Sequence, residues 1–217
     1  NNCTSDLNAW AGLFKEFATL LGVNPDMGEI FTRLYTHALG GDADCGGLVS
    51  YNYFSGEPVM GFAEGRPLLV RSVNDTFNLA NFVRANLHAA VAVLKVGNDI
   101  LFNQEHVKVD RLTGHGGLFK TPEAGQRILS AALGTPITVM STAGEGGAWG
   151  MALLASYLVN NPEAADLPSW LESKVFAANT GSTTLCATPA EIAGFERYMA
   201  NYLACLPVET AAIAAKA

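Results

Sequence analysis

The chain has 217 residues, of which 49% are hydrophobic and 15% charged, which is enough for one large domain or two small ones with a real core. Its formal net charge of −7 and isoelectric point near 5.0 argue against nucleic acid as a partner, since affinity for a phosphate backbone comes largely from clustered Lys and Arg. Its apolar runs are short and interrupted and no signal-peptide pattern opens it, so we expect no membrane contact and a cytoplasmic location.

The first predicted element is an amphipathic helix over residues 6–17. Thr4 or Ser5 would cap it, and its apolar side chains recur at the 3.6-residue spacing of one buried face. These side chains are Leu7, Trp10, Leu13, Phe14 and Phe17. Because the chain begins at Asn1 and enters this helix almost at once, we expect a fragment of a longer protein.

The next segment combines a helix with short extended pieces. Residues 25–41 predict a helix that ends at a Gly-Gly pair, and residues 42–45 predict a loop. Two extended segments follow at 47–54 and 67–73, with a turn at 55–58 after the first. Neither has the pattern of a long central strand.

A strong helical pattern then covers residues 79–96, and Gly97-Asn98 would close it. Its predicted apolar face consists of Leu79, Phe82, Val83, Leu87, Val91 and Leu94.

The following part alternates between strand and helix patterns. We expect strands at residues 106–112 and 137–140. A Gly-rich turn follows each strand, at 113–117 and 144–147, and a helix follows each turn, at 121–133 and 148–159. This βαβα alternation predicts an α/β fold that binds a ligand at the C-terminal ends of its strands, where both turns lie. Residues 162–217 predict an Ala-rich helical tail.

The two Gly-rich turns suit nucleotide binding. Glycine lets the backbone approach a ligand closely, and the helix that follows offers unpaired N–H groups and a positive dipole end to phosphate. The turns do not match the dinucleotide fingerprint, which needs a third Gly where this chain has Phe119, nor the P-loop or the hydrolase nucleophile elbow. From the residues alone, the alternative is a pair of ordinary strand-to-helix turns.

The cysteines and histidines carry no metal or redox pattern. The chain has no Cys-x-x-Cys pair, and its histidines lack the i, i+4 spacing of metal ligands. The cysteines are Cys3, Cys45, Cys186 and Cys205, and the histidines are His37, His88, His106 and His115. We expect no metal held by side chains, and no catalytic role for His115, which has no acid or base beside it.

Three groups of residues together resemble a known family. A Gly-led extended segment at 65–70 precedes a helix containing Arg84-Ala85, a Gly-rich loop covers 109–121, and a Gly-rich helix entry covers 144–155. They resemble the second signature, the adenosine loop and the Glu-x-x-Ala-x-Gly-Ala-Ala entry of FGGY-family carbohydrate kinases, in the C-terminal domain. The resemblance is closest to kinases of the xylulokinase and ribulokinase type, although His88 stands where the family often has Glu.

This resemblance implies a ribonuclease H-like (actin-like ATPase) α/β domain with a mixed sheet, flanking helices and extra helices at both ends. Residues 1–217 would be the nucleotide-binding domain, with 162–217 a helical C-terminal extension and the N-terminal sugar-binding domain absent. Full-length family members transfer the γ-phosphate of MgATP to a sugar hydroxyl, here a pentulose such as xylulose or ribulose. The general base would lie outside this chain, which would bind ATP or ADP with Mg²⁺ but not turn over.

Two other functions remain open at this point. The chain could belong to a non-catalytic nucleotide- or sugar-sensing protein of the same superfamily. It could also be a helical interaction module in which the Gly-rich turns bind nothing. A homodimer is a further expectation for the full-length protein.

The resemblance assigns the Gly-rich loop to the nucleotide. Gly116 and Gly117 match the family's Gly-Gly pair, which would place backbone N–H groups against the α-phosphate and ribose. Gly114 would make the turn possible. The alternative for all three is a turn without a ligand.

Four further residues are candidates for the adenine end. Lys120 and Thr121 would flank the adenine, although Thr121 could instead be an N-cap with Pro122 at the first helical position. Ser5 and Asn8 lie where the family's first helix approaches adenine; the alternative for them is a cap and a solvated polar face.

The second turn is expected to support the loop. Gly144 and Glu145 would do so, with Glu145 accepting backbone hydrogen bonds; alternatively, Glu145 only favours the helix N-terminus through the helix dipole. No catalytic residue is expected in this chain.

Overall fold

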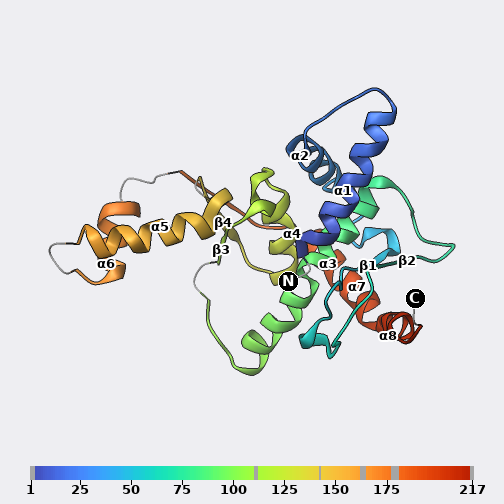
Figure 1. Cartoon of the computed structure of the whole chain (residues 1–217). Helices are drawn as coiled ribbons and strands as arrows, with labels where there is room; N and C mark the ends of the chain where they lie inside the picture. The colour runs from blue at the N-terminus through green and yellow to red at the C-terminus, as the bar shows by residue number, and fades with distance from the viewer. Residues whose placement is uncertain (1–2, 110–111, 142, 162–164, 177–180, 216–217) are drawn as a thin grey trace.

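The structure is a computed structural model that describes residues 3–109, 112–141, 143–161, 165–176 and 181–215. Figure 1 shows a helical body around two small sheets, from which α5 and α6 project. The elements are α1 (Cys3–Leu20), α2 (Met27–Ala38), η1 (Cys45–Gly47), β1 (Val49–Tyr51), η2 (Pro58–Met60), β2 (Leu68–Val70), α3 (Leu79–Asp99), η3 (Ile100–Gln104), β3 (Leu112–Gly114), η4 (Gly117–Lys120), α4 (Ala124–Leu133), β4 (Ile137–Met140), η5 (Ala143–Glu145), α5 (Gly146–Val159), α6 (Leu167–Leu171), η6 (Glu172–Phe176), β5 (Ser182–Leu185), α7 (Pro189–Ala204) and α8 (Leu206–Ala214).

The strands form two sheets. β1 and β2 are an antiparallel pair, and β3, β4 and β5 lie side by side in that order. β3 and β4 are parallel, with Leu112 opposite Ile137, and α4 is the crossover that parallel neighbours require. β5 runs antiparallel to β4, with Leu185 opposite Ile137. The prediction of an α/β fold with a mixed sheet and flanking helices is therefore confirmed.

α3 runs through the body and supplies much of the core (Figure 1). Most of its predicted apolar face is buried, namely Phe82, Val83, Leu87 and Val91. Leu79 and Leu94 of that face are exposed. The predicted end at Gly97 is wrong, because Gly97 keeps helical backbone and Lys95 pairs with Asp99 at 2.7 Å across the last turn.

The first two helices begin differently from one another. α1 already includes Thr4 and Ser5, so the prediction that either residue caps it is wrong. The helix predicted at 25–41 is present as α2. It begins after Asp26, whose side chain accepts the backbone N–H of Glu29 at 2.8 Å.

α1 is fastened to α3 by aromatic side chains. The rings of Trp10 and Phe14 pack edge-on against Phe82, with ring centroids 4.7 and 6.0 Å apart. Leu13 and Phe17 are 51% and 60% exposed. The buried stripe of α1 is therefore narrower than the predicted apolar face.

α4 begins later than predicted. The backbone of Glu123 has a φ of 65°, which is not helical, so the helix can form only from the next residue onward. Thr121 is extended, with φ −84° and ψ 119°, and its side chain is buried. The alternative in which Thr121 caps α4 with Pro122 in its first turn is therefore wrong.

β3 and α5 also differ from their predicted bounds. β3 covers Leu112–Gly114 instead of 106–112, and residues 110–111 lie outside the described part of the chain. Its shift places Gly114 at the end of the strand. α5 begins at Gly146, earlier than the predicted 148.

The last part of the chain, predicted as a helical tail at 162–217, contains a strand as well as α6, α7 and α8. β5 is fixed by tertiary contacts. The hydroxyls of Thr138 and Thr184 lie 2.9 Å apart across β4 and β5, and the amide of Gln126 donates to the carbonyl of Thr183 at 2.9 Å.

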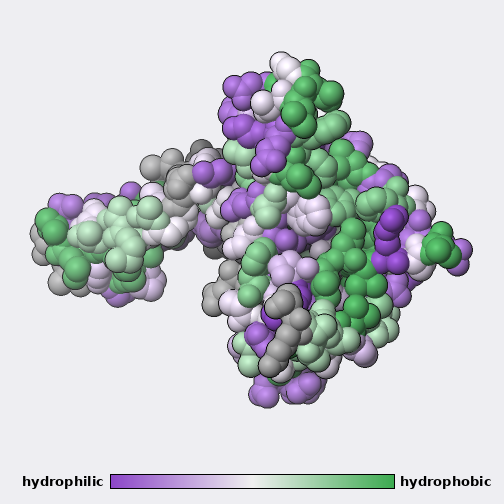
Figure 2. Space-filling view, turned by 45° about the vertical axis from the view of Figure 1, so that its right-hand side comes forward, coloured by the Kyte–Doolittle hydropathy of each residue, from purple (hydrophilic) through white to green (hydrophobic). Residues whose placement is uncertain are grey.

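α5 projects from the body and packs against α6 (Figure 1). The rings of Tyr157 and Trp170 meet edge-on with centroids 5.6 Å apart, and the Tyr157 hydroxyl donates to the carbonyl of Ala165 at 2.9 Å. None of the α5 side chains described is buried, and Leu158 is 82% exposed. Figure 2 shows hydrophobic residues over this projecting part.

Candidate functional site

A pocket of about 380 Å³ lies between α1, α2 and the segment that follows β3. We call it the α1–α2 pocket. It is lined by Leu7, Asn8, Gly28, Phe31, Thr32, Tyr35, Gly117, Leu118, Lys120 and Thr121. Its lining is mostly apolar with a few amide, hydroxyl and amine groups, which is the composition of a site for a small organic ligand.

Each of the three wall segments has packing contacts that hold it in place. α1 is anchored through the aromatic contacts with Phe82, and Leu7 beside them is buried. On α2, the rings of Phe31 and Tyr35 lie 5.5 Å apart and present one aromatic surface to the pocket. In the third wall segment, Thr121 is buried at the end that leads to α4.

The Gly-rich loop after β3 is folded against the second Gly-rich turn. The backbone N–H of Gly116 donates to the carbonyl of Ala143 at 2.7 Å, and that of Phe119 donates to Gly116 at 3.1 Å. A Cβ atom on Gly146 would lie 2.9 Å from the Cβ of His115. The two turns that the sequence places one helix apart are therefore side by side.

The three glycines of the first loop have different roles. A side chain at Gly114 would collide with the Phe119 ring, so this glycine allows the loop to pack on itself. Gly116 has φ 107°, a conformation that L side chains rarely adopt. Gly117 has neither constraint: an added Cβ would meet nothing within 4 Å, and the residue lines the α1–α2 pocket. Gly117 is therefore the point where backbone is open to a ligand.

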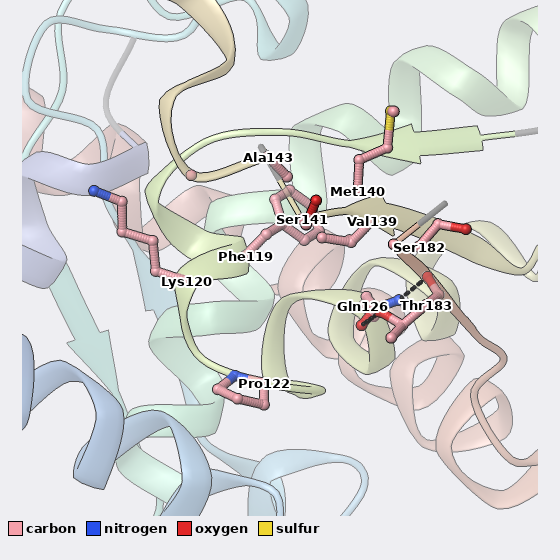
Figure 3. A pocket seen from close by; sticks show the side chains of 12 residues that line it. Phe119, Lys120, Pro122, Gln126, Val139, Met140, Ser141, Ala143, Ser182 and Thr183 are labelled. Carbon is pink, nitrogen blue, oxygen red and sulfur yellow. Dashed lines mark hydrogen bonds between the residues drawn. The ribbon is translucent and has the colours of Figure 1, made fainter. Parts of the chain in front are cut away.

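A second pocket, of about 540 Å³, lies across α4, β4 and β5 (Figure 3), and we call it the sheet pocket. Its lining is Phe119, Lys120, Pro122, Gln126, Val139, Met140, Ser141, Ala143, Gly144, Gly181, Ser182 and Thr183. Gln126 braces it by donating to the carbonyls of Ile137 and Thr183, both at 2.9 Å. Lys120 lines both pockets, and Figure 3 shows its amine directed away from the strands.

The structure brings together four of the predicted nucleotide-binding residues. Asn8 comes from α1, and Gly117, Lys120 and Thr121 come from the segment after β3; all four line one pocket. Ser5 is exposed on α1 and is not part of either lining.

The remaining predicted residues surround the loop. Gly144 lines the sheet pocket, where an added Cβ would lie 3.1 Å from the Cε of Lys120. Glu145 lies in η5, and its side chain is outside the described atoms. Gly114 and Gly116 shape the loop without lining either pocket.

Sequence reasoning missed the contribution of α2. Phe31, Thr32 and Tyr35 lie on a helix that was predicted correctly, but helical periodicity does not distinguish a face that lines a pocket from one that packs on a core. The i, i+4 spacing of the two aromatic residues was the available signal.

Two buried titratable side chains of the core, His88 and Cys45, are neutral at pH 7. Burial, and then the charge of Arg84, hold the pKa of His88 well below its usual value, and burial raises the pKa of the Cys45 thiol. The Cys45 sulfur lies 3.3 Å from Nδ1 of His88. Both side chains are fully buried away from the two pockets, so their role is structural.

Within the part of the chain that the structure describes, no group of three or more His, Cys, Asp or Glu residues is placed to hold a metal ion. No helix among the described segments is long and apolar enough to span a bilayer.

The fold is similar to that of several solved kinases of xylulose and glycerol. A ligand-bound xylulose kinase from Lactobacillus acidophilus matches with a TM-score of 0.63 and 16% identity over 81% of this chain and 34% of that one. A Plasmodium falciparum glycerol kinase with ADP matches with a TM-score of 0.60 and 16% identity, over 92% and 37%. A Rhodospirillum rubrum xylulose kinase matches with a TM-score of 0.57 and 18% identity, over 82% of this chain and 33% of that one. The chain thus spans about a third of the length of these kinases, whose fold is the actin-like ATPase fold.

No curated protein sequence matches the chain. The family model described as the C-terminal domain of the FGGY family of carbohydrate kinases matches residues 1–159, which include both Gly-rich turns and every wall of the α1–α2 pocket. The chain therefore belongs to the FGGY family of carbohydrate kinases and contains the family's C-terminal domain.

Proposed function

We propose that this chain is the ATP-binding half of a carbohydrate kinase and that the α1–α2 pocket holds the adenosine part of the nucleotide. The observation that carries the proposal is that Asn8, Gly117, Lys120 and Thr121, assigned to the nucleotide by the family resemblance, converge on one pocket. The pocket has an aromatic wall from α2 and an open backbone at Gly117.

Each wall has a chemical role in this proposal. The aromatic surface of Phe31 and Tyr35 covers the purine by apolar contact, and Asn8 and Thr121 offer polar groups to its edge. Gly117 lets the chain approach the ribose and α-phosphate. Lys120 lines both pockets and supplies positive charge near the phosphates of the nucleotide, in a chain whose net charge is otherwise negative.

Mg²⁺ fits this arrangement as a partner of the nucleotide. Mg²⁺ usually keeps several waters and binds substrate phosphates with one or two carboxylates, so the described residues need not provide a dedicated cage. Bound in this way, it would neutralise charge on the phosphates during transfer.

The rest of the reaction would depend on a second domain. Phosphoryl transfer requires an acceptor hydroxyl, a base and the nucleotide to be positioned together. We propose that an N-terminal sugar-binding domain supplies the base and the sugar, that residues 162–217 form a C-terminal extension, and that this chain alone binds nucleotide without turnover. A pentulose acceptor, a cytoplasmic location and a homodimer of the whole protein are parts of the same proposal. The similar folds include those of xylulose kinases.

Filling the α1–α2 pocket from α2 should block the nucleotide. Thr32 is exposed and lines the pocket, so Thr32→Trp adds an indole to the proposed purine site without entering the core. We expect MgADP binding, measured by calorimetric titration, to weaken at least about tenfold, which corresponds to about 1.4 kcal/mol.

Thr36→Trp is the matched control. Thr36 is exposed one turn further along α2 and is not part of the pocket lining, so its indole should leave MgADP affinity within about twofold. Equal affinities in the two variants and the unchanged chain would place the nucleotide elsewhere.

A further inference from the structure

A buried carboxylate links three helices and, through two arginines, connects the end of α2 with the first turns of α4. Glu191 of α7 is buried, and its Oε1 atom faces two arginines from different helices. Nη2 of Arg127 on α4 lies 2.6 Å from it, and Nη2 of the fully buried Arg84 on α3 lies 3.6 Å from it. One oxygen atom therefore joins α3, α4 and α7.

Arg84 connects Glu191 to α2. Its Nη1 atom donates to three carbonyls at the end of α2, those of Ala38 at 3.5 Å, Leu39 at 3.3 Å and Gly41 at 3.2 Å. A positive charge at a helix C-terminus is favourable because the helix dipole is negative there. The position of α2 is thus tied to the guanidinium group, and through it to Glu191.

Arg127 connects Glu191 to α4, which follows the wall segment at residues 117–121. Its Nε and Nη2 atoms both donate to Oε1 of Glu191, at 3.0 and 2.6 Å. Arg127 follows Gln126 in the first turns of α4, directly after the segment that contributes Gly117 and Thr121 to the pocket. The first turns of α4 are therefore tied to the same carboxylate oxygen as α2.

The carboxylate itself is fixed in orientation. Oε2 of Glu191 accepts the backbone N–H of Thr188 at 2.9 Å and its hydroxyl at 3.0 Å, in a capping box at the start of α7. Burial raises the pKa of Glu191, but hydrogen bonds from Thr188 and Arg127 outweigh it and hold that pKa below its usual value. The group is ionised at neutral pH and leaves Oε1 for the arginines.

We infer that Glu191 is a positioning residue that sets the separation of α2 from the η4–α4 segment, and thereby the selectivity of the α1–α2 pocket for its nucleobase. The inference rests on the proposed function. Glu191 does not line the pocket and acts through Arg84 and Arg127. Removing its charge leaves the buried Arg84 without its counter-ion. The end of α2 and the first turns of α4 are then no longer held by the same carboxylate oxygen.

The test separates positioning from loss of stability. A variant that only unfolds more often weakens every nucleotide by the same factor, because apparent affinity scales with the competent fraction. The ratio of the dissociation constants for MgGDP and MgADP cancels that factor. In Glu191→Gln we expect MgADP binding to weaken at least about fivefold and this ratio to fall at least about threefold towards one.

Thr188→Ala is the matched control, because it removes the hydroxyl of the capping box while leaving Oε1 and both arginines in place. It should lower stability and leave the ratio unchanged. Arg127→Met provides a second test if Glu191→Gln does not fold, since Arg127 is partly exposed and ties only α4; it should also lower the ratio.

The outcomes distinguish this inference from the proposed function. A lower ratio in Glu191→Gln or Arg127→Met, but not in Thr188→Ala, supports the positioning role. An unchanged ratio in folded variants overturns it while leaving nucleotide binding intact. Failure of the unchanged, folded chain to bind MgADP overturns the proposed function and this inference together.

Discussion

Replacing Gly117 with valine should abolish nucleotide binding and leave the chain folded. A Cβ at this position meets nothing within 4 Å, and Gly117 has no positive φ, so the substitution introduces no clash and little strain. The added side chain instead occupies the space through which backbone would approach ribose and phosphate. In calorimetric titrations with MgADP we expect affinity to fall at least about 100-fold, or about 2.7 kcal/mol.

The neighbouring glycine gives this experiment its control. Gly114→Ala should disturb the loop itself, because a Cβ there collides with the Phe119 ring, and should therefore lower thermal stability as well as affinity. Gly117→Val should lower affinity alone. Unchanged MgADP affinity in a folded Gly117→Val variant would contradict the assignment of this backbone to the nucleotide.

Phe82→Ala should cause the largest loss of stability among core substitutions near the site. Phe82 is almost fully buried on α3, and its ring contacts Trp10 and Phe14 of α1 and Phe77. Truncation of a buried Phe costs about 3–5 kcal/mol through lost transfer free energy and the cavity that remains. We expect a loss of that size in denaturant unfolding monitored by circular dichroism.

The same change should loosen the wall of the pocket that α1 provides. Because Asn8 lies on α1 beside the aromatic anchor, MgADP binding should weaken as well. Phe82→Leu, which keeps most of the buried volume, should cost less than about 1.5 kcal/mol. A loss below about 1 kcal/mol for Phe82→Ala would show that α1 is not held by these rings.

Much of the α/β order could be predicted because local signals agree with tertiary structure there. Ile137 to Met140 is a β-branched and apolar run between turn residues, and it became β4 as predicted. β5 was missed because Ser182 to Leu185 is short and its first three residues are polar and exposed. It is a strand because β4 and the amide of Gln126 hold its backbone.

The start of α4 shows a different limit of sequence reasoning. Thr121 followed by Pro122 is a normal helix start, but the positive φ of Glu123 interrupts the helical path. The reason is tertiary: Thr121 is buried in the wall of the pocket and its backbone is extended. Thr121, although threonine favours N-cap positions, is therefore a packing residue here.

The candidate site was predictable in its loops but not in its helices. The Gly-rich turn and Lys120 follow a strand in the sequence, so their position at the strand end could be inferred. The aromatic wall from α2 and the contact of Glu191 with two arginines depend on how distant segments pack. Nothing in the local pattern around Glu191 beyond its capping box indicates the buried charge.

The proposed position of adenine is between α1, α2 and the segment at residues 117–121. Photolabelling with 2-azido-ADP and Mg²⁺, followed by peptide mapping, tests it most directly because the reactive group is on the base. We expect label in α1, α2 or residues 117–121 that excess MgATP removes. Competable label confined to the sheet pocket, at residues 137–144 or 181–183, would contradict it.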